Sequence, residues 1–135
     1  MAKDIALFNI LTNNLMSVAR EMSADFLRSA YSVVIREAAD CSTFLADAKG
    51  RILAQPQDQP LHMNSVSRAL TGALSKIDAT NLTEDDAIIL NDPYSGGQHL
   101  SDIYIFSPIV HDGKLVAFAG TTGHHADLGH SAGFN

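Results

Sequence analysis

Apolar side chains recur every three or four residues over the first quarter of the chain, which is the spacing of one face of an α-helix. The stripe comprises Ile5, Phe8, Leu11, Leu15, Val18, Met22 and Phe26. Asp4 stands before it and is suited to cap the helix N-terminus. The pattern therefore predicts a helix over residues 4–29, with one apolar stripe over roughly six turns.

A second helical pattern begins at Asn64 or Ser65. Its apolar face carries Val66, Leu70, Ala73, Leu74 and Ile77. Gly72 lies inside this helix and weakens it by roughly 1 kcal/mol relative to alanine. Residues 30–40 are ambiguous, because the β-branched run 33–35 favours either a strand or the end of the first helix.

Two segments predict β-hairpins. In the first, residues 43–46 and 51–54 flank a turn that ends in Gly50. In the second, residues 103–110 and 114–120 flank Asp112-Gly113, a strong turn signal. Residues 87–90 read as a short buried strand, and no regular element is expected after Thr121. The order of elements predicts an α+β fold, with the helices packed on a mainly antiparallel sheet.

The composition of the chain disfavours or excludes several classes of protein. The net charge of −6 disfavours nucleic-acid binding, which needs a basic surface. No apolar run is long enough for a membrane span. The single cysteine, Cys41, excludes an intrachain disulfide and suits a reducing cytoplasm. Cys41 is a possible nucleophile, but without a paired base in the sequence a small buried thiol is the favoured interpretation.

Five of the six histidines and seven of the nine glycines lie in the last 40 residues. Within this stretch His99 and Asp102 precede the second hairpin, and the segment His124-His125-Ala126-Asp127 follows it. Two imidazoles and a carboxylate make an open site for a divalent ion. The glycines before His99 favour a turn there, and the hairpin returns the chain to its start. We therefore expect the two segments to meet in space.

Neighbouring residues of an extended chain point in opposite directions, so only one of His124 and His125 is expected to be a ligand. The other faces substrate or packs, and Asp127 is placed to orient a ligand imidazole. Hydrogen-bonded structural histidines are the competing interpretation. His111 is expected to face solvent and His62 to pack or cap a helix. The charged residues Arg36, Glu37 and Asp40 are either an ion-paired surface or the wall of a polar site.

The segments 91–102 and 124–129 resemble the hydantoinase B/oxoprolinase family, whose members carry NDPY-x-GG-x-H-L-x-D and HHAD-x-G motifs. The resemblance implies part of a B-type subunit of an ATP-dependent enzyme that acts on cyclic amides such as hydantoins or 5-oxoproline. It also implies a divalent metal, Zn, Mn or Fe, bound by His99, Asp102 and His124. Asp92, His125 and Asp127 are candidates for orienting those ligands or facing substrate.

In that family a hydantoinase A-like subunit handles ATP, so the resemblance implies a hetero-oligomer in the cytoplasm. The family also contains acetone carboxylase-type enzymes, which are an alternative. Gly129-His130 stands where many members have two glycines, and Gln98 and Ser101 also depart from common family residues. Members are several-fold longer, so residues 1–135 are expected to form the N-terminal portion of a larger domain, incomplete by themselves. A non-catalytic assembly fragment is the third possibility.

Overall fold

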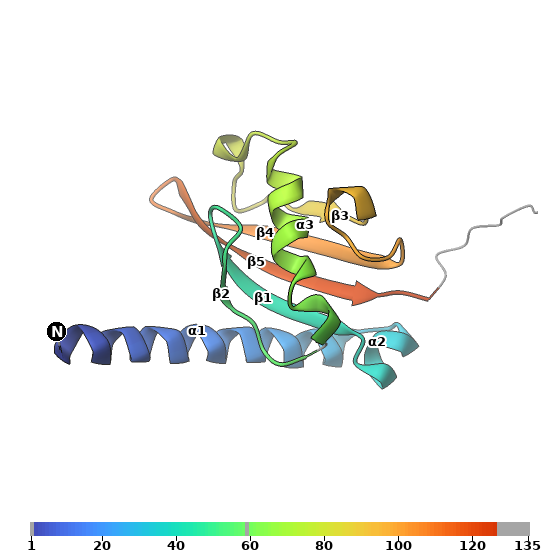
Figure 1. Ribbon diagram of the computed structural model, residues 1–135, viewed down its shortest axis with the longest axis horizontal. Helices are drawn as coiled ribbons and strands as arrows, with labels where there is room; N and C mark the ends of the chain where they lie inside the picture. The colour runs from blue at the N-terminus through green and yellow to red at the C-terminus, as the bar shows by residue number, and fades with distance from the viewer. Residues whose placement is uncertain (1, 59, 127–135) are drawn as a thin grey trace, which may run out of the picture.

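The computed structural model describes residues 2–58 and 60–126. Its centre is a five-stranded antiparallel sheet with strand order β2-β1-β5-β4-β3 (Figure 1). The strands are β1 (Cys41–Asp47), β2 (Ile52–Ala54), β3 (Ile88–Leu90), β4 (Asp102–His111) and β5 (Lys114–His124). The helices are α1 (Ala2–Ser29), α2 (Val33–Ala38) and α3 (Ser65–Leu74), with short 3₁₀ turns η1 (Pro60–His62), η2 (Ala79–Asn81) and η3 (Pro93–Ser95). The α+β, antiparallel prediction is confirmed.

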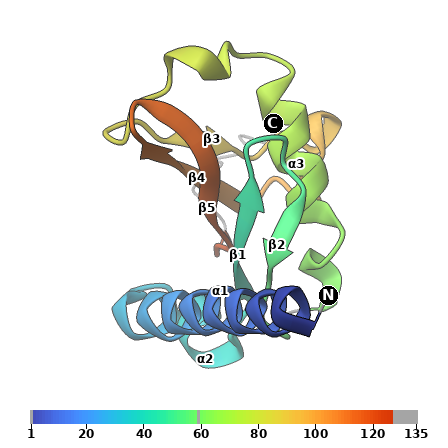
Figure 2. The same cartoon turned by 90° about the vertical axis from the view of Figure 1, so that its left-hand side faces the viewer.

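Strand β1 is covered on both faces, because α1 and α3 lie on different sides of it (Figures 1 and 2). Successive side chains of a strand alternate between faces. Phe44 therefore joins the α3 side, where Phe106 meets its ring edge-on at a centroid distance of 5.8 Å. Leu45 turns the other way and packs with Ala19 of α1. The main core thus lies between the sheet and α3, with Val66 and Leu70 as its helical contribution.

Helix α1 ends at Ser29 as predicted but begins at Ala2, two residues early, so Asp4 lies in its first turn and is not its cap. Only the second half of the helix is packed. Leu15 and Met22 contact the cluster formed with Ala19 on the sheet. The first turns extend past the strands (Figure 1), and there Ile5 is 57% and Phe8 68% exposed. Val18 of the predicted stripe is also 47% exposed, whereas Ala19 beside it is fully buried. The face that packs on β1 and β2 therefore follows the predicted stripe only in part. Among the described residues, no helix is both long and apolar enough to cross a membrane.

Three local predictions differ from the structure. The ambiguous run 33–35 lies in the short helix α2, which Ser32 caps by accepting from the Ile35 N–H at 3.5 Å. Helix α3 ends at Leu74, before Ile77. Strand β5 continues four residues past the expected end at 120. Its last residues pair with the start of β4 as far as Asp102 opposite His124, and up to Gly123 they also pair with residues 41–43 of β1. The pairing with β1 joins segments about 80 positions apart and has no local signal in the sequence.

Both hairpin turns use the expected glycines. Gly50 has φ +82°, and in the second turn Asp112 and Gly113 have φ of 50° and 70°. Positive φ at both central residues is the type I′ pattern, whose twist matches the strands that it joins. The predicted Asp-Gly turn is thus confirmed. Beyond it, a bulge between Ile109 and Val110 shifts the β4–β5 register by one residue, and this shifted register sets which residues meet at the far end of the hairpin.

Candidate metal centre

The β4–β5 register places Asp102 directly opposite His124. Asp102 is the first residue of β4 and His124 is the last residue of β5, so both stand at the end of the hairpin that is far from its turn. Directly opposed residues of an antiparallel pair share one face of the sheet. The hairpin therefore converts a sequence separation of 22 residues into side-chain contact.

His99 reaches the same place through a tight turn. The Asp102 N–H donates to the His99 carbonyl at 3.1 Å. In return the His99 N–H donates to Asp102 Oδ2 at 3.0 Å. This reciprocal pairing closes residues 99–102 into a turn and holds both side chains on one side, as the spacing of three predicted.

Asp102 lies between the two imidazoles. Its Oδ1 is 2.6 Å from His124 Nδ1 and its Oδ2 is 3.2 Å from His99 Nδ1. The imidazole rings meet edge to face, with centroids 5.5 Å apart. One ligand atom from each of the three side chains can be chosen so that all lie within 4.8 Å of one another. Within the described ranges, this is the group of His, Cys, Asp and Glu side chains whose spacing fits a metal ion.

The exposure of the three side chains is graded. Asp102 is 1% exposed, His124 is 32% exposed and His99 is 62% exposed. A carboxylate removed from water needs a compensating charge or hydrogen bonds. Here the two imidazoles can meet this need in either of two ways. Their N–H groups donate hydrogen bonds to the carboxylate, or a cation displaces those protons and is bound by the imidazoles together with the carboxylate. An ion held by these three side chains would be open to water or a substrate on the exposed side at His99.

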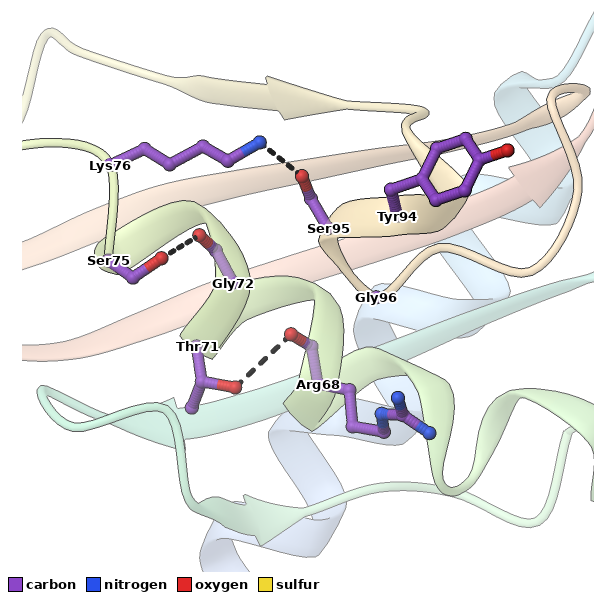
Figure 3. Close-up of a pocket in the computed structure, with 8 residues that line it drawn as sticks. All are labelled: Arg68, Thr71, Gly72, Ser75, Lys76, Tyr94, Ser95 and Gly96. Carbon is purple, nitrogen blue, oxygen red and sulfur yellow. Dashed lines mark hydrogen bonds between the residues drawn. The ribbon is translucent and has the colours of Figure 1, made fainter.

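The loop that carries His99 is fixed on α3 (Figure 3). The Lys76 ammonium donates to the Ser95 hydroxyl of η3, and Ser95 in turn donates to Asp92. An added Cβ at Gly72 would lie 1.9 Å from the Ser95 carbonyl oxygen. Gly72 thus weakens the helix but permits a backbone approach that an alanine would block. Gly96, at φ +107°, makes a similarly close contact with the backbone of that helix.

Asp92 has a local role in this loop. Its Oδ1 accepts the Tyr94 N–H at 2.9 Å, and it caps η3. The hydrogen bond from Ser95 and that from Tyr94 hold the pKa of Asp92 below its usual value. Its carboxylate lies outside the group formed by His99, Asp102 and His124.

The remaining candidate residues from the sequence do not join this group of three side chains in the part of the chain that the structure describes. His125 turns away from His124, donates its N–H to the Ser101 carbonyl at 2.9 Å and lines a mainly apolar recess with Phe26 and Ile35. Asp127 lies outside the described residues. His111 faces solvent beside Asp112, as expected.

Sequence reasoning missed how close His62 comes to this site. It is 2% exposed, which confirms packing, but its Nδ1 lies 3.0 Å from Ser42 Oγ and its Nε2 3.9 Å from Asp40 Oδ1. Burial lowers the pKa of His62, against the opposing effect of the carboxylates of Asp102 and Asp40.

The charged cluster at 36–40 divides in two. Arg36 and Glu37 form an exposed ion pair at 3.0 Å, whereas the Asp40 carbonyl accepts the His124 N–H at 2.9 Å. Asp40 thus borders the site through its backbone carbonyl, and its carboxylate faces His62 at 3.9 Å. Cys41 is buried and free. Burial first, then the carboxylates of Asp58 and Asp40, raise its pKa to about 11, which agrees with a structural thiol.

Comparison with known proteins extends these observations. The 5-oxoprolinase of Dictyostelium discoideum is 30% identical over 126 residues, which is 93% of this chain and 10% of that protein. The B-type subunit of a putative D-/L-hydantoinase from Pseudomonas sp. (strain NS671) is 31% identical over 125 residues, 90% of this chain and 21% of that protein. This chain therefore spans about a tenth to a fifth of the length of these relatives.

The fold is also shared with a solved protein. A nucleotide-free acetone carboxylase superposes with a TM-score of 0.79 at 21% identity, over 91% of this chain and 16% of that one. Such a likeness establishes the fold. The sequence match to hydantoinase B/oxoprolinase runs over residues 4–133. Since that match takes in both His/Asp segments and nearly all of the chain, the protein belongs to the hydantoinase B/oxoprolinase family.

Proposed function

We propose that His99, Asp102 and His124 bind one divalent metal ion in a B-type subunit of an ATP-dependent enzyme that hydrolyses cyclic amide bonds. The observation that carries the proposal is the convergence of three ligand atoms to within 4.8 Å from two separate segments. Family membership supports the reaction class, because the relatives include a 5-oxoprolinase and a component of a putative hydantoinase.

The types of ligand atom limit which metal ions suit the site. Two imidazole nitrogens and one carboxylate suit Zn²⁺, Mn²⁺ or Fe²⁺, whereas Ca²⁺ and Mg²⁺ prefer oxygen ligands alone. A metal bound there would polarise an amide carbonyl or lower the pKa of a bound water. The chain's own contribution is to hold the ligands: Asp102 from the start of β4, His124 from the end of β5 and His99 from the turn fixed on α3.

The energy source and the partner belong to the same proposal. A hydantoinase A-like subunit handles ATP, and the two chains form a hetero-oligomer in the cytoplasm. The naming of the Pseudomonas relative as one subunit of its enzyme supports an assembly of this kind.

The carboxylase branch is the second candidate, and the likeness to acetone carboxylase favours it. The two reactions differ in what they consume. A complex reconstituted with its ATP-handling partner either hydrolyses a cyclic amide or fixes bicarbonate onto a ketone. Assaying both reactions with the same preparation distinguishes them. Carboxylation of the ketone without any hydrolysis of the cyclic amide would reject the amidase.

The exposed first turns of α1 favour a third candidate, a non-catalytic assembly role. Ile5, Phe8 and Leu11 are each more than half exposed. Contiguous apolar surface of this kind marks an interaction site or an association hazard. This candidate requires stable association without metal, so the metal measurement below separates it from the first two.

The test is the metal content of purified wild type, His99→Ala, Asp102→Ala and the control His111→Ala. The proposal expects about one equivalent of metal in wild type and in His111→Ala, since His111 has a similar pairing with an acid but lies at the hairpin turn. The two site variants are expected to lose it. Equal, substoichiometric metal in all four proteins would reject the site.

A further inference from the structure

His62 is a buried side chain whose contacts run toward the metal centre from the core. It belongs to η1, in a different part of the chain from the three ligands. Its ring is 2% exposed, and the Ser42 hydroxyl that meets Nδ1 at 3.0 Å is itself fully buried. A ring enclosed and hydrogen-bonded in this way has one orientation, so the direction of its second nitrogen is set by the fold.

The sheet register explains why that second nitrogen points to the site. Ser42 is opposite Thr122, and Thr122 is opposite Tyr104, so these residues share the face that α3 covers. Two residues earlier in the chain than Ser42 the same face is occupied by Asp40, whose carbonyl accepts the N–H of His124. His62 lies over this face, and its Nε2 is 3.9 Å from Asp40 Oδ1.

These contacts form a continuous series from the core to the solvent. Ser42 holds His62, and His62 faces Asp40. The Asp40 backbone holds His124, whose imidazole is 2.6 Å from Asp102. Asp102 then contacts His99. His62 is the step in this series that connects the ligands to a side chain in the fully buried part of the sheet.

The charge state of His62 fits a donor role. Burial keeps its pKa below the usual value of 6.5, so the ring is neutral at pH 7. A neutral imidazole carries one N–H. With the Ser42 hydroxyl available to donate to Nδ1, the N–H falls on Nε2, toward the carboxylates of Asp40 and Asp102, which are the strongest charged neighbours of the ring. The separation of 3.9 Å exceeds a direct hydrogen bond, so the ring and the carboxylate are close polar neighbours across this gap.

We propose that His62 is a positioning residue of the metal centre: anchored by Ser42, it presents its Nε2–H to Asp40 and thereby holds the segment that places His124. The inference rests on the proposed function, because it assigns His62 to the same centre. Partners of this outer kind fix the orientation of metal ligands, and losing one typically costs about 10- to 100-fold in metal affinity.

Two substitutions separate this role from simple packing. His62→Asn places an amide near the Nδ1 position and keeps a partner for Ser42, but has nothing at Nε2. His62→Gln reaches the Nε2 position with an amide that can donate. Affinity for Co²⁺ and the visible absorption spectrum of bound Co²⁺, which reports ligand geometry, are measured for both variants and wild type. Ser67→Ala, which removes a hydroxyl that donates to the Gly50 carbonyl, is the matched control away from the site.

The proposal expects His62→Asn to bind Co²⁺ about tenfold or more weakly with an altered spectrum, and His62→Gln to stay near wild type. Ser42→Ala, a small change at a buried site, is also expected to weaken Co²⁺ binding. It replaces His62→Asn as the test variant if His62→Asn fails to fold. Wild-type affinity in His62→Asn and Ser42→Ala would overturn the proposal, as would an equal loss in His62→Asn and His62→Gln. If wild type itself bound no Co²⁺, the proposed function would fail first.

Discussion

Asp102 Oδ1 lies 2.6 Å from His124 Nδ1, and the two residues are direct partners across β4 and β5. A shift of one residue in this register would turn His124 to the opposite face of the sheet and break the contact. The register at Asp102 depends on the bulge between Ile109 and Val110 as well as on the turn at Asp112-Gly113, and neither of these contacts the ligands.

Asp102→Asn keeps the size of the side chain and an oxygen for the His99 N–H, but removes the charge. We expect metal affinity to fall at least about tenfold, because a buried amide neither balances a cation nor ligates it well. The thermal unfolding midpoint should change much less. Isothermal titration with Zn²⁺ or Mn²⁺ measures the affinity.

Asp112→Asn is the matched control for that titration. Asp112 also pairs with a histidine, His111, but both side chains are exposed at the hairpin turn. Affinity equal to wild type is expected. An equal loss of affinity in both variants would mean that net charge, and not the Asp102 carboxylate, governs binding.

Gly72→Ala should destabilise the protein even though alanine favours helix. The new Cβ would lie 1.9 Å from the Ser95 carbonyl, so the α3–η3 contact in Figure 3 must open. Forcing extra volume into such a contact costs about 1–3 kcal/mol. Because this contact holds the loop that carries His99, metal affinity is expected to fall together with stability.

Gly113→Ala separates the two effects. Gly113 has φ +70° and open space around its Cα, so an alanine there is strained but meets no neighbour. Stability should fall while metal affinity is kept, since the residue is far from the ligands. Parallel thermal unfolding and metal titration of both glycine variants check this, and a stabilised Gly72→Ala would contradict the account.

Cys41 should resist alkylation in the folded protein. Its pKa of about 11, against an ordinary value of 9.0, leaves about a hundredfold less thiolate at pH 8 than a free thiol has. Burial adds a steric barrier. Iodoacetamide labelling followed by mass spectrometry should be slow in buffer and fast in guanidinium chloride. Rapid labelling of the native protein at pH 8 would restore Cys41 as a candidate nucleophile.

The double substitution Ile5→Ser, Phe8→Ser should lower the binding of a hydrophobic dye and any concentration-dependent self-association. Both side chains are exposed, so the unfolding free energy should change by about 0.5 kcal/mol or less. Leu15→Ser, on the same stripe but packed against the sheet, should be clearly destabilised. Equal loss of stability in the two proteins would show that the first turns are packed in solution.

Sequence patterns predicted the elements whose signals are local. The apolar stripe of α1, the Asp-Gly turn and the turn at His99 all follow from neighbouring residues, and all are present in the structure. The meeting of His99, Asp102 and His124 followed from one further step, that a hairpin returns the chain to its start.

Long-range pairing could not be predicted in the same way. The pairing of β5 with β1 joins distant segments, and the exposure of Ile5 depends on where the sheet ends. His62 is separated from the ligands by dozens of residues, and only the packing of η1 over the sheet reveals that it faces Asp40. These features arise from tertiary contacts, which a single sequence does not display.

The most direct test of the central claim is a crystal of the wild-type protein grown with Mn²⁺ or Zn²⁺ and measured at the absorption edge of that metal. The account predicts one anomalous peak in contact with His99, Asp102 and His124, at ligand distances of about 2.0–2.2 Å. A fully occupied peak elsewhere, or none at these three side chains at saturating metal, would contradict it.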